Sequence, residues 1–330
     1  MNASQIKKNK FSIGTFLGNW AALLTIALLV VFFTIRLPGM FFTLSNLETI
    51  LRSISIITVV AMGLTLTLSV GGFDLSGGYM ATIASYIIMS LILWYSMNPV
   101  LSGVIAMFAC FALTMVTMFL IVVCKIPDLL ATVAMMFILE GIGLTYTGGG
   151  AISAGMPRPD GQISKGVVPA GFKVIGTSPT IIIIMVVIVA LVHIFMSYTK
   201  FGRYIYATGG NKIAARLSGI NVKKYRVIAG LLATFFLAAG GILVAARNQS
   251  AQINGAVAYQ MPALAAVFIG RSVAGQGKPN ALGTLVGSIL VGILENGLVM
   301  MSVPYYSLNA VKGAVLAIAL ISAYYNAKDE

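Results

Sequence analysis

The sequence predicts an all-α polytopic membrane protein, and its composition, mean hydropathy and length support this fold class. Of its 330 residues, 59% are hydrophobic and only 9% are charged, and the mean hydropathy is +0.98. Soluble domains carry roughly 25% charged residues, so a water-soluble fold could not bury this much apolar surface. A bilayer core about 30 Å thick requires about 20 apolar residues per helix, which leaves room for about ten transmembrane helices.

Apolar segments divide the chain into predicted membrane helices. They lie at residues 17–35, 50–70, 77–96, 100–123, 128–147, 179–198, 227–246, 260–274, 281–302 and 305–325. Most have the length that a membrane-spanning helix needs. Residues 1–330 are therefore expected to form a single transmembrane domain without a soluble domain.

The distribution of charge predicts the orientation of the chain. The net charge is +13, but the basic residues form short clusters between apolar segments, which is the pattern of cytosolic membrane loops. We therefore expect membrane lipid, and no nucleic acid, as a partner. Lys7, Lys8 and Lys10 precede a long apolar run without a cleavage site, which predicts an uncleaved first helix. Both termini are expected to be cytosolic in a bacterial inner membrane.

Two long hydrophilic loops remain between the predicted helices. Residues 148–178 are rich in Gly, Pro and Ser and are expected to be extracytoplasmic. Residues 199–226 carry seven Lys or Arg and no acidic residue, and are expected to be cytosolic. Within this second loop, the run KIAARLSGI follows a Gly-Gly-Asn break and suits a short helix lying across the membrane surface.

The sequence indicates neither catalysis nor cofactor binding. Lys278 follows Gly277 as in a phosphate-binding loop, but Pro279 stands where Ser or Thr is required. Two cysteines and one histidine indicate neither a disulfide framework nor a zinc site. The eight acidic residues and the histidine form no recognisable catalytic or metal-binding pattern. We therefore expect no enzyme activity, no cofactor and no metal site.

The loop at 199–226 carries a resemblance to a known family. The stretch FGRYIYATGGNKIAARLSGINV resembles the cytosolic loop of permeases from bacterial ABC importers, in the ribose or simple-sugar branch of the branched-chain amino acid-like, binding-protein-dependent transport family. In that family the loop forms the coupling helix, which seats in a groove of the ATPase subunit. The resemblance assigns this coupling role to Gly209, Gly210, Asn211, Ala214, Ala215, Arg216, Gly219 and Ile220.

The resemblance also predicts which side of the loop faces the partner. We expect a helix over residues 211–220 whose small side chains, Ala214, Ala215 and Gly219, pack into the ATPase groove. The nearby basic residues are expected to meet acidic or lipid surfaces; they are Arg216, Lys223, Lys224 and Arg226. An ordinary positively charged loop would explain the lysines but not the order of the GGN and AARLSGI motifs.

Two further stretches resemble the same family and extend the similarity over most of the chain. GLTLTLSVGGFDLSGGYMA resembles a family segment that ends in Gly-Gly-x-Asp-Leu-Ser, and ALAAVFIGRSVAGQGKPNALGTLVGSILVGILENGL resembles the glycine-rich eighth and ninth helices. The departures are at Arg271 and Ser272, where Gly-Thr is common, at Gln276, and at the pair Gly77 and Gly78. They leave the substrate and the choice between homodimer and heterodimer open.

The resemblance implies a type II ABC importer-like permease and a set of partners. Two permease copies, or this chain and a similar one, would enclose a central path for a simple sugar or another small polar solute. An extracytoplasmic solute-binding protein would deliver the solute, and cytosolic ATP-binding subunits would hydrolyse ATP. This chain would then be no enzyme itself.

Four polar residues are candidates either for the translocation path or for a structural role. Asp74 and Ser76 lie between two apolar segments, where the Asp74 side chain is expected to cap the next helix. Glu295 and Asn296 lie within an apolar segment, where an unpaired charge costs on the order of 3 kcal/mol, so Glu295 should face protein or water.

The main alternative is a secondary transporter driven by an ion gradient. Such a carrier needs acidic residues or broken helices within the membrane, and Glu140 and Glu295 could supply the acids. It has no need of the GGNKIAARLSGI loop, which therefore favours the ATP-driven importer.

Overall fold

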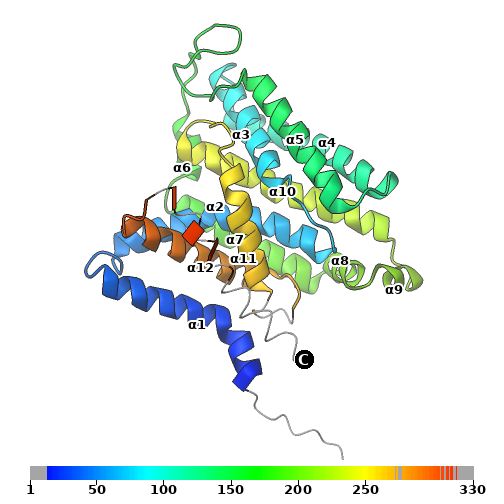
Figure 1. The fold of residues 1–330 in the computed structure, drawn as a ribbon. Helices are drawn as coiled ribbons and strands as arrows, with labels where there is room; N and C mark the ends of the chain where they lie inside the picture. The colour runs from blue at the N-terminus through cyan, green and yellow to red at the C-terminus, as the bar shows by residue number, and fades with distance from the viewer. Residues whose placement is uncertain are drawn as a thin grey trace, which may run out of the picture.

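The computed structural model describes residues 13–271, 273, 277–304, 306–307, 310–311, 313–314 and 317. Within this part of the chain, the fold is all-α (Figure 1). Its helices are α1 (Ile13–Arg36), α2 (Leu44–Ser69), α3 (Gly77–Leu93), α4 (Pro99–Met118), α5 (Asp128–Thr147), α6 (Ala170–Ile175), α7 (Thr180–Tyr198), α8 (Lys200–Gly210), α9 (Lys212–Leu217), α10 (Val222–Asn248), α11 (Gln260–Gly270) and α12 (Ala281–Met300). A π-helical segment, Phe119–Val123, extends α4, and a short 3-10 turn, Val257–Tyr259, precedes α11.

Polar side chains set the starts of several long helices. The Thr43 hydroxyl accepts a hydrogen bond from the Asn46 backbone at the start of α2, and Asn98 accepts one from Val100 at the start of α4. Asn280 accepts a bond of 2.7 Å from the Gly283 backbone at the start of α12. These side chains satisfy backbone N–H groups that have no partner inside the helix.

Nine of the predicted apolar segments coincide with helices of the described residues, namely α1, α2, α3, α4, α5, α7, α10, α11 and α12. Among these residues, six helices are long and apolar enough to cross a membrane, and three further apolar helices are shorter. The three N-terminal lysines lie outside the described residues. Most of the tenth predicted segment, 305–325, lies outside them as well.

Two of the shorter helices are completed by irregular backbone. Helix α3 has 17 residues and α11 has 11, fewer than the ~20 that a straight crossing requires. Residues 70–76 lead into α3, and residues 249–259 lead into α11. The two irregular segments meet inside the bundle, where Gln260 Nε2 donates a hydrogen bond of 2.9 Å to the Asp74 carbonyl. Non-helical backbone inside a membrane protein is tolerated where the protein itself surrounds it.

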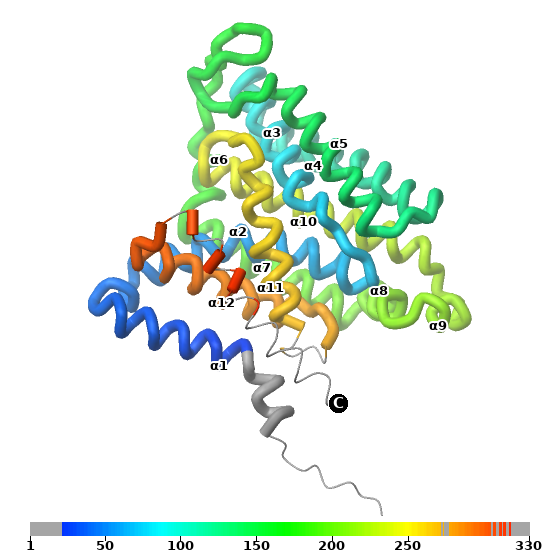
Figure 2. Tube along the Cα trace, viewed as in Figure 1, coloured from blue at the N-terminus to red at the C-terminus, as the bar shows by residue number. Residues whose placement is uncertain are grey.

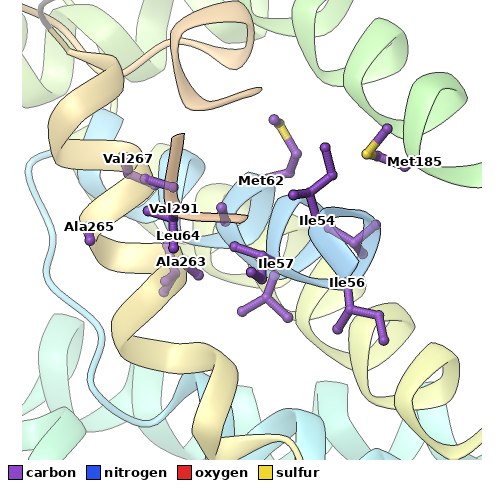
Figure 3. Close-up of a cluster of buried hydrophobic side chains, with 14 of the residues drawn as sticks. Ile54, Ile56, Ile57, Met62, Leu64, Met185, Ala263, Ala265, Val267 and Val291 are labelled. Carbon is purple, nitrogen blue, oxygen red and sulfur yellow. The ribbon is translucent and has the colours of Figure 1, made fainter. Parts of the chain in front are cut away.

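The core is built around α2, which is largely buried, whereas most residues of α4, α5 and α7 are exposed or only partly buried. Figure 3 shows side chains from α2, among them Ile54, Ile57 and Met62, packed against Met185 of α7 and Val291 of α12. The exposed apolar faces of the outer helices suit contact with lipid.

Glycines allow helices α11 and α12 to approach closely. A Cβ atom on Gly283 would lie 2.1 Å from the Gly270 carbonyl oxygen, and one on Gly287 would lie 2.0 Å from that of Ala266. The Gly283-x-x-x-Gly287 pair therefore forms a face on which the two helices pack closely.

The two ends of the bundle can be told apart by their contacts. At one end, here called the α9 end, residues 70–76, 124–127 and 199–221 gather, as Figure 2 shows for α8 and α9. At the opposite end, here called the hairpin end, residues 148–178 form a bridge between Pro157 and Ile163 and contain the short helix α6.

Candidate functional site

Helix α8 lies across the α9 end of the bundle and is fixed there by its buried side. The Thr199 hydroxyl caps the helix by accepting a bond of 3.1 Å from the Gly202 backbone. Ile205 and Thr208 are buried, and a Cβ atom on Gly202 would lie 2.3 Å from the Met196 carbonyl oxygen. Helix α8 thus has one side that packs against the bundle and another that remains exposed.

The last turn of α8 touches the ends of two membrane helices. A Cβ atom on Gly209 would lie 2.1 Å from the Ser69 carbonyl oxygen at the end of α2, so only glycine fits there. The Tyr206 hydroxyl donates a bond of 2.8 Å to the Pro279 carbonyl just before α12. Burial raises the pKa of the Tyr206 phenol, which keeps the hydroxyl protonated as this bond requires.

Helix α9 is short; a polar side chain caps its start, and a glycine turn closes its end. The Asn211 side chain accepts bonds from the Ile213 and Ala214 backbone, at 2.9 and 3.0 Å. After the helix, Gly219 has φ +78°, and its N–H donates to the Arg216 carbonyl. A left-handed glycine at this position ends a helix without steric cost. Asn221 then caps α10.

Two apolar side chains project from α9, in which every residue except Ala215 is exposed. Ile213 is 73% exposed and Leu217 is 84% exposed, although both lie in a polar loop region. They are four residues apart and therefore lie on the same face of the helix. The other exposed residues of this turn are Lys212, Ala214, Arg216 and Ser218.

The expectation of one helix over 211–220 with a small outward face is corrected by the structure. The helix ends at Leu217, so Gly219 belongs to the turn that follows it. Ala215 is only 4% exposed and packs against its own chain, whereas Ala214 is exposed. Gly210 is exposed and has open space around it, and Ile220 is half-buried. The three small residues therefore do not share a face.

A second finding concerns Arg226, which was expected to meet an acidic or lipid surface and instead meets an acidic residue of its own chain. Its guanidinium forms an ion pair with the Asp128 carboxylate, and their side chains are only 15% and 19% exposed. This pair joins α10 to the first residue of α5. The Asp128 carboxylate also borders Gly72, where a Cβ atom would lie 2.9 Å from Oδ2.

Asp74 and Ser76 lie in the irregular segment 70–76 and bind each other. The Asp74 carboxylate accepts bonds of 2.8 Å from the Ser76 backbone and 2.7 Å from the Ser76 hydroxyl. This geometry agrees with the predicted cap, since it satisfies an N–H group at the start of α3. The start of the segment lies next to α8: a Cβ atom on Gly71 would lie 3.2 Å from Gly209 Cα.

Sequence reasoning missed Gln260, which holds this segment in place. Gln260 is 3% exposed, its Nε2 donates to the Asp74 carbonyl, and its Oε1 has no hydrogen-bond partner among the described residues. The available signal was a polar amide at the first position of a predicted apolar helix, which needs partners inside a membrane protein.

A narrow pocket opens beside segment 70–76 and is lined by both apolar and polar side chains. Its polar lining consists of Thr67, Asp74, Ser76, Thr114, Thr117, Asp128, Thr132, Arg226 and Thr234. Some of these groups bind one another, as in the 2.5 Å contact between the Thr114 and Thr234 hydroxyls. The pocket thus connects the Arg226–Asp128 ion pair with the candidate path residues.

The other two candidates, Glu295 and Asn296, lie elsewhere, toward the end of α12. Asn296 Nδ2 donates a bond of 3.0 Å to Asn46 Oδ1 near the start of α2. Glu140 accepts a bond of 3.3 Å from Asn254, which ties α5 to the segment before α11. Within the described residues, no three His, Cys, Asp or Glu side chains are grouped so that they could hold a metal.

Comparison with known proteins places the chain in a family. A family model described as "Branched-chain amino acid transport system / permease component" matches residues 46–322. The ribose import permease protein RbsC of Escherichia coli K12 is 30% identical over 324 residues, covering 97% of this chain and 98% of the relative. RbsC of Bacillus subtilis is 31% identical and covers 94% and 91%, respectively.

Relatives that are named for other sugars match as well. The galactose/methyl galactoside import permease protein MglC of Haemophilus influenzae is 28% identical over 304 residues, covering 87% of this chain and 89% of the relative. No solved structure matches the chain. The family match spans most of the sequence, and the apolar helices of the fold agree with it; the chain is therefore a multi-pass membrane protein that belongs to the family of branched-chain amino acid transport system permease components.

Proposed function

We propose that the chain is the transmembrane permease subunit of an ATP-driven ABC importer for a simple sugar or a similar small polar solute. The names of its relatives, which include ribose, xylose and galactose permeases, support this substrate class. A separate cytosolic subunit hydrolyses ATP, and an extracytoplasmic binding protein delivers the solute. A second permease copy, or a similar permease, completes the path.

The observation that carries the proposal is the exposed apolar pair on α9. Ile213 and Leu217 project from a helix whose two ends are fixed by Asn211 and Gly219, so their exposure belongs to an ordered surface. An ordered helix with two apolar side chains four residues apart is the form in which helices dock into apolar grooves. We assign this groove to the ATP-binding subunit.

The orientation of the bundle forms part of the proposal. The α9 end carries exposed cations, among them Lys200, Lys212 and Lys224, which favours the cytosolic side. We expect a reporter that is active only outside the cytosol to give signal when fused after Ala154, at the hairpin end. The same reporter fused after Lys212 should give none. Signal from the Lys212 fusion would place α9 outside and would remove the ATPase assignment.

The direct test replaces the apolar pair. Burial of two such side chains at a contact contributes about 1.5–3 kcal/mol each, so Ile213→Asp with Leu217→Asp should lower the affinity for the ATP-binding subunit by more than about 100-fold. Co-purification of the two subunits and solute uptake by the assembled importer are the measurements. Both should be lost while the permease is still inserted in the membrane.

A matched variant keeps both apolar side chains and removes two exposed charges from the first turn of α10. Lys223→Gln with Lys224→Gln should change assembly little, since exposed ion pairs contribute under about 1 kcal/mol. Normal assembly by the Asp variant, or failure of the Gln variant alone, would contradict docking through Ile213 and Leu217. Uptake that persists without any ATP-binding subunit would favour the ion-driven carrier instead.

A further inference from the structure

The outward side of α8 carries two stripes of side chains beside its buried side. Lys200 and Arg203 are exposed and lie three residues apart, so they share one stripe. Phe201 and Tyr204, 46% and 38% exposed, form the neighbouring stripe. The aromatic stripe lies between the cations and the buried residues around Ile205. This pattern is typical of helices that lie in the plane of a membrane surface.

The aromatic rings mark the level of α8 relative to the bilayer. The Phe195 and Phe201 rings are stacked with centroids 6.4 Å apart, and Tyr204 meets Tyr225 edge-on at 5.0 Å. Phe195 belongs to the last turn of α7, whose apolar sequence ends at Tyr198. Aromatic residues gather at the boundary between hydrocarbon and head groups, so α8 starts where the α7 crossing ends.

Among the described residues, no acidic side chain forms an ion pair with the cations of α8. Residues 199–226 contain seven Lys or Arg and no Asp or Glu. Asp128, at the start of α5, is already bound to Arg226. Lys200 and Arg203 therefore present uncompensated positive charge beside the exposed Phe201 and Tyr204 rings.

We propose that α8 is a binding site for anionic phospholipid head groups. The head-group phosphate lies between the Lys200 ammonium and the Arg203 guanidinium, and the Phe201 and Tyr204 rings pack against the glycerol and upper acyl region. Bound lipid fixes α8 at the membrane surface and thereby positions α9, to which it is joined through Gly210 and Asn211. The site does not depend on the ATP-binding subunit.

An acidic protein partner is the competing occupant of this surface, and the location of the cations decides against it. A protein that docks on Ile213 and Leu217 approaches α9, which follows α8 and carries its own exposed cations, Lys212 and Arg216. The cations of α8 instead adjoin the aromatic stripe of Phe201 and Tyr204, whose rings contact Tyr225.

The test uses the purified full-length permease alone, reconstituted in nanodiscs of phosphatidylcholine with or without phosphatidylglycerol. Retained phosphatidylglycerol is counted by native mass spectrometry, and the thermal unfolding midpoint is measured in both kinds of disc. Each cation near an anionic surface contributes about fivefold in affinity, so Lys200→Gln with Arg203→Gln should weaken retention by roughly 25-fold. The rise in unfolding midpoint that phosphatidylglycerol gives the wild type should disappear, and high salt should reduce it as well.

The matched control, Lys212→Gln with Arg216→Gln, removes the same charge from α9 and should retain phosphatidylglycerol like the wild type. Equal losses in both variants would show that net charge acts without a site on α8 and would overturn the proposal. Inorganic phosphate added to phosphatidylcholine discs separates the two sources of the anion: equal stabilisation by free phosphate would replace the lipid assignment with a soluble-anion site. Because the ATP-binding subunit is absent, failure here leaves the importer assignment untouched.

Discussion

Two regions of this permease use glycine and polar residues for opposite purposes. In α8 and α9, Asn211 and Gly219 terminate helices so that an apolar pair projects outward. In the segment 70–76 and the first residue of α3, Asp74 and Gly77 lie inside the bundle, where they let irregular backbone pack beside Gln260. The same residue types produce an exposed surface in one place and a buried junction in the other.

The difference lies in where the backbone groups find their partners. On the surface, water binds the backbone groups that the capping residues leave unpaired, so each turn tolerates substitution. Inside the bundle, each N–H and carbonyl needs a protein partner, and Asp74, Ser76 and Gln260 supply these to one another. Gly71 and Gly209 are in contact, so the two regions adjoin and a movement of α8 bears on the start of segment 70–76.

The largest effect is expected from a substitution that disturbs the contact between α8 and the end of α2. Gly209→Ala introduces a Cβ atom 2.1 Å from the Ser69 carbonyl oxygen, which is backbone and cannot rotate away. We expect a loss of about 3 kcal/mol in stability or displacement of α8, and with it a loss of uptake. The thermal unfolding midpoint and solute uptake are the measurements.

The adjacent glycine is the control for this change. A methyl group added at Gly210 would have no neighbouring atom within 4 Å, so Gly210→Ala should be neutral or slightly stabilising, as expected for alanine in a helix. Equal effects at the two positions would mean that α8 does not pack against the end of α2.

A smaller effect is expected at the ion pair beside the pocket. Arg226→Gln leaves the half-buried Asp128 carboxylate without its partner, which costs about 2 kcal/mol. Arg226→Lys keeps the charge and should retain most of the stability. In a double-mutant cycle, Arg226→Gln with Asp128→Asn should lose less than the sum of the single losses. Additive losses in unfolding free energy would show that the two side chains do not interact.

The sequence was a good guide to the membrane helices and a poor one to the direction of side chains. Hydropathy located nine apolar helices of the described residues because burial in lipid dominates their composition. Helix α8 escaped prediction, since its three glycines lower helix propensity and its position depends on packing against α2, α7 and α10. Ala215 and Gly219 were placed on a docking face because both are small, although the turn at Gly219 directs them differently.

Long-range pairs could not be read from the sequence at all. Arg226 and Asp128 are 98 residues apart, and Gln260 and Asp74 are 186 apart. Their pairing depends on how the helices assemble. The apolar pair Ile213 and Leu217, by contrast, was readable, because its spacing of four residues places both on one helical face.

The smallest predicted effect concerns the turn after α9 and separates its role from docking. Gly219 has φ +78° and open space around it, so a side chain there meets no neighbour but strains the backbone. Gly219→Ala should therefore cost about 1 kcal/mol, and Gly219→Asn less, because asparagine tolerates the left-handed conformation. Co-purification of the ATP-binding subunit should weaken slightly with alanine and recover with asparagine. If asparagine impairs assembly more than alanine, side-chain size at this position matters, and Gly219 lies in the contact rather than ending the helix that presents Ile213 and Leu217.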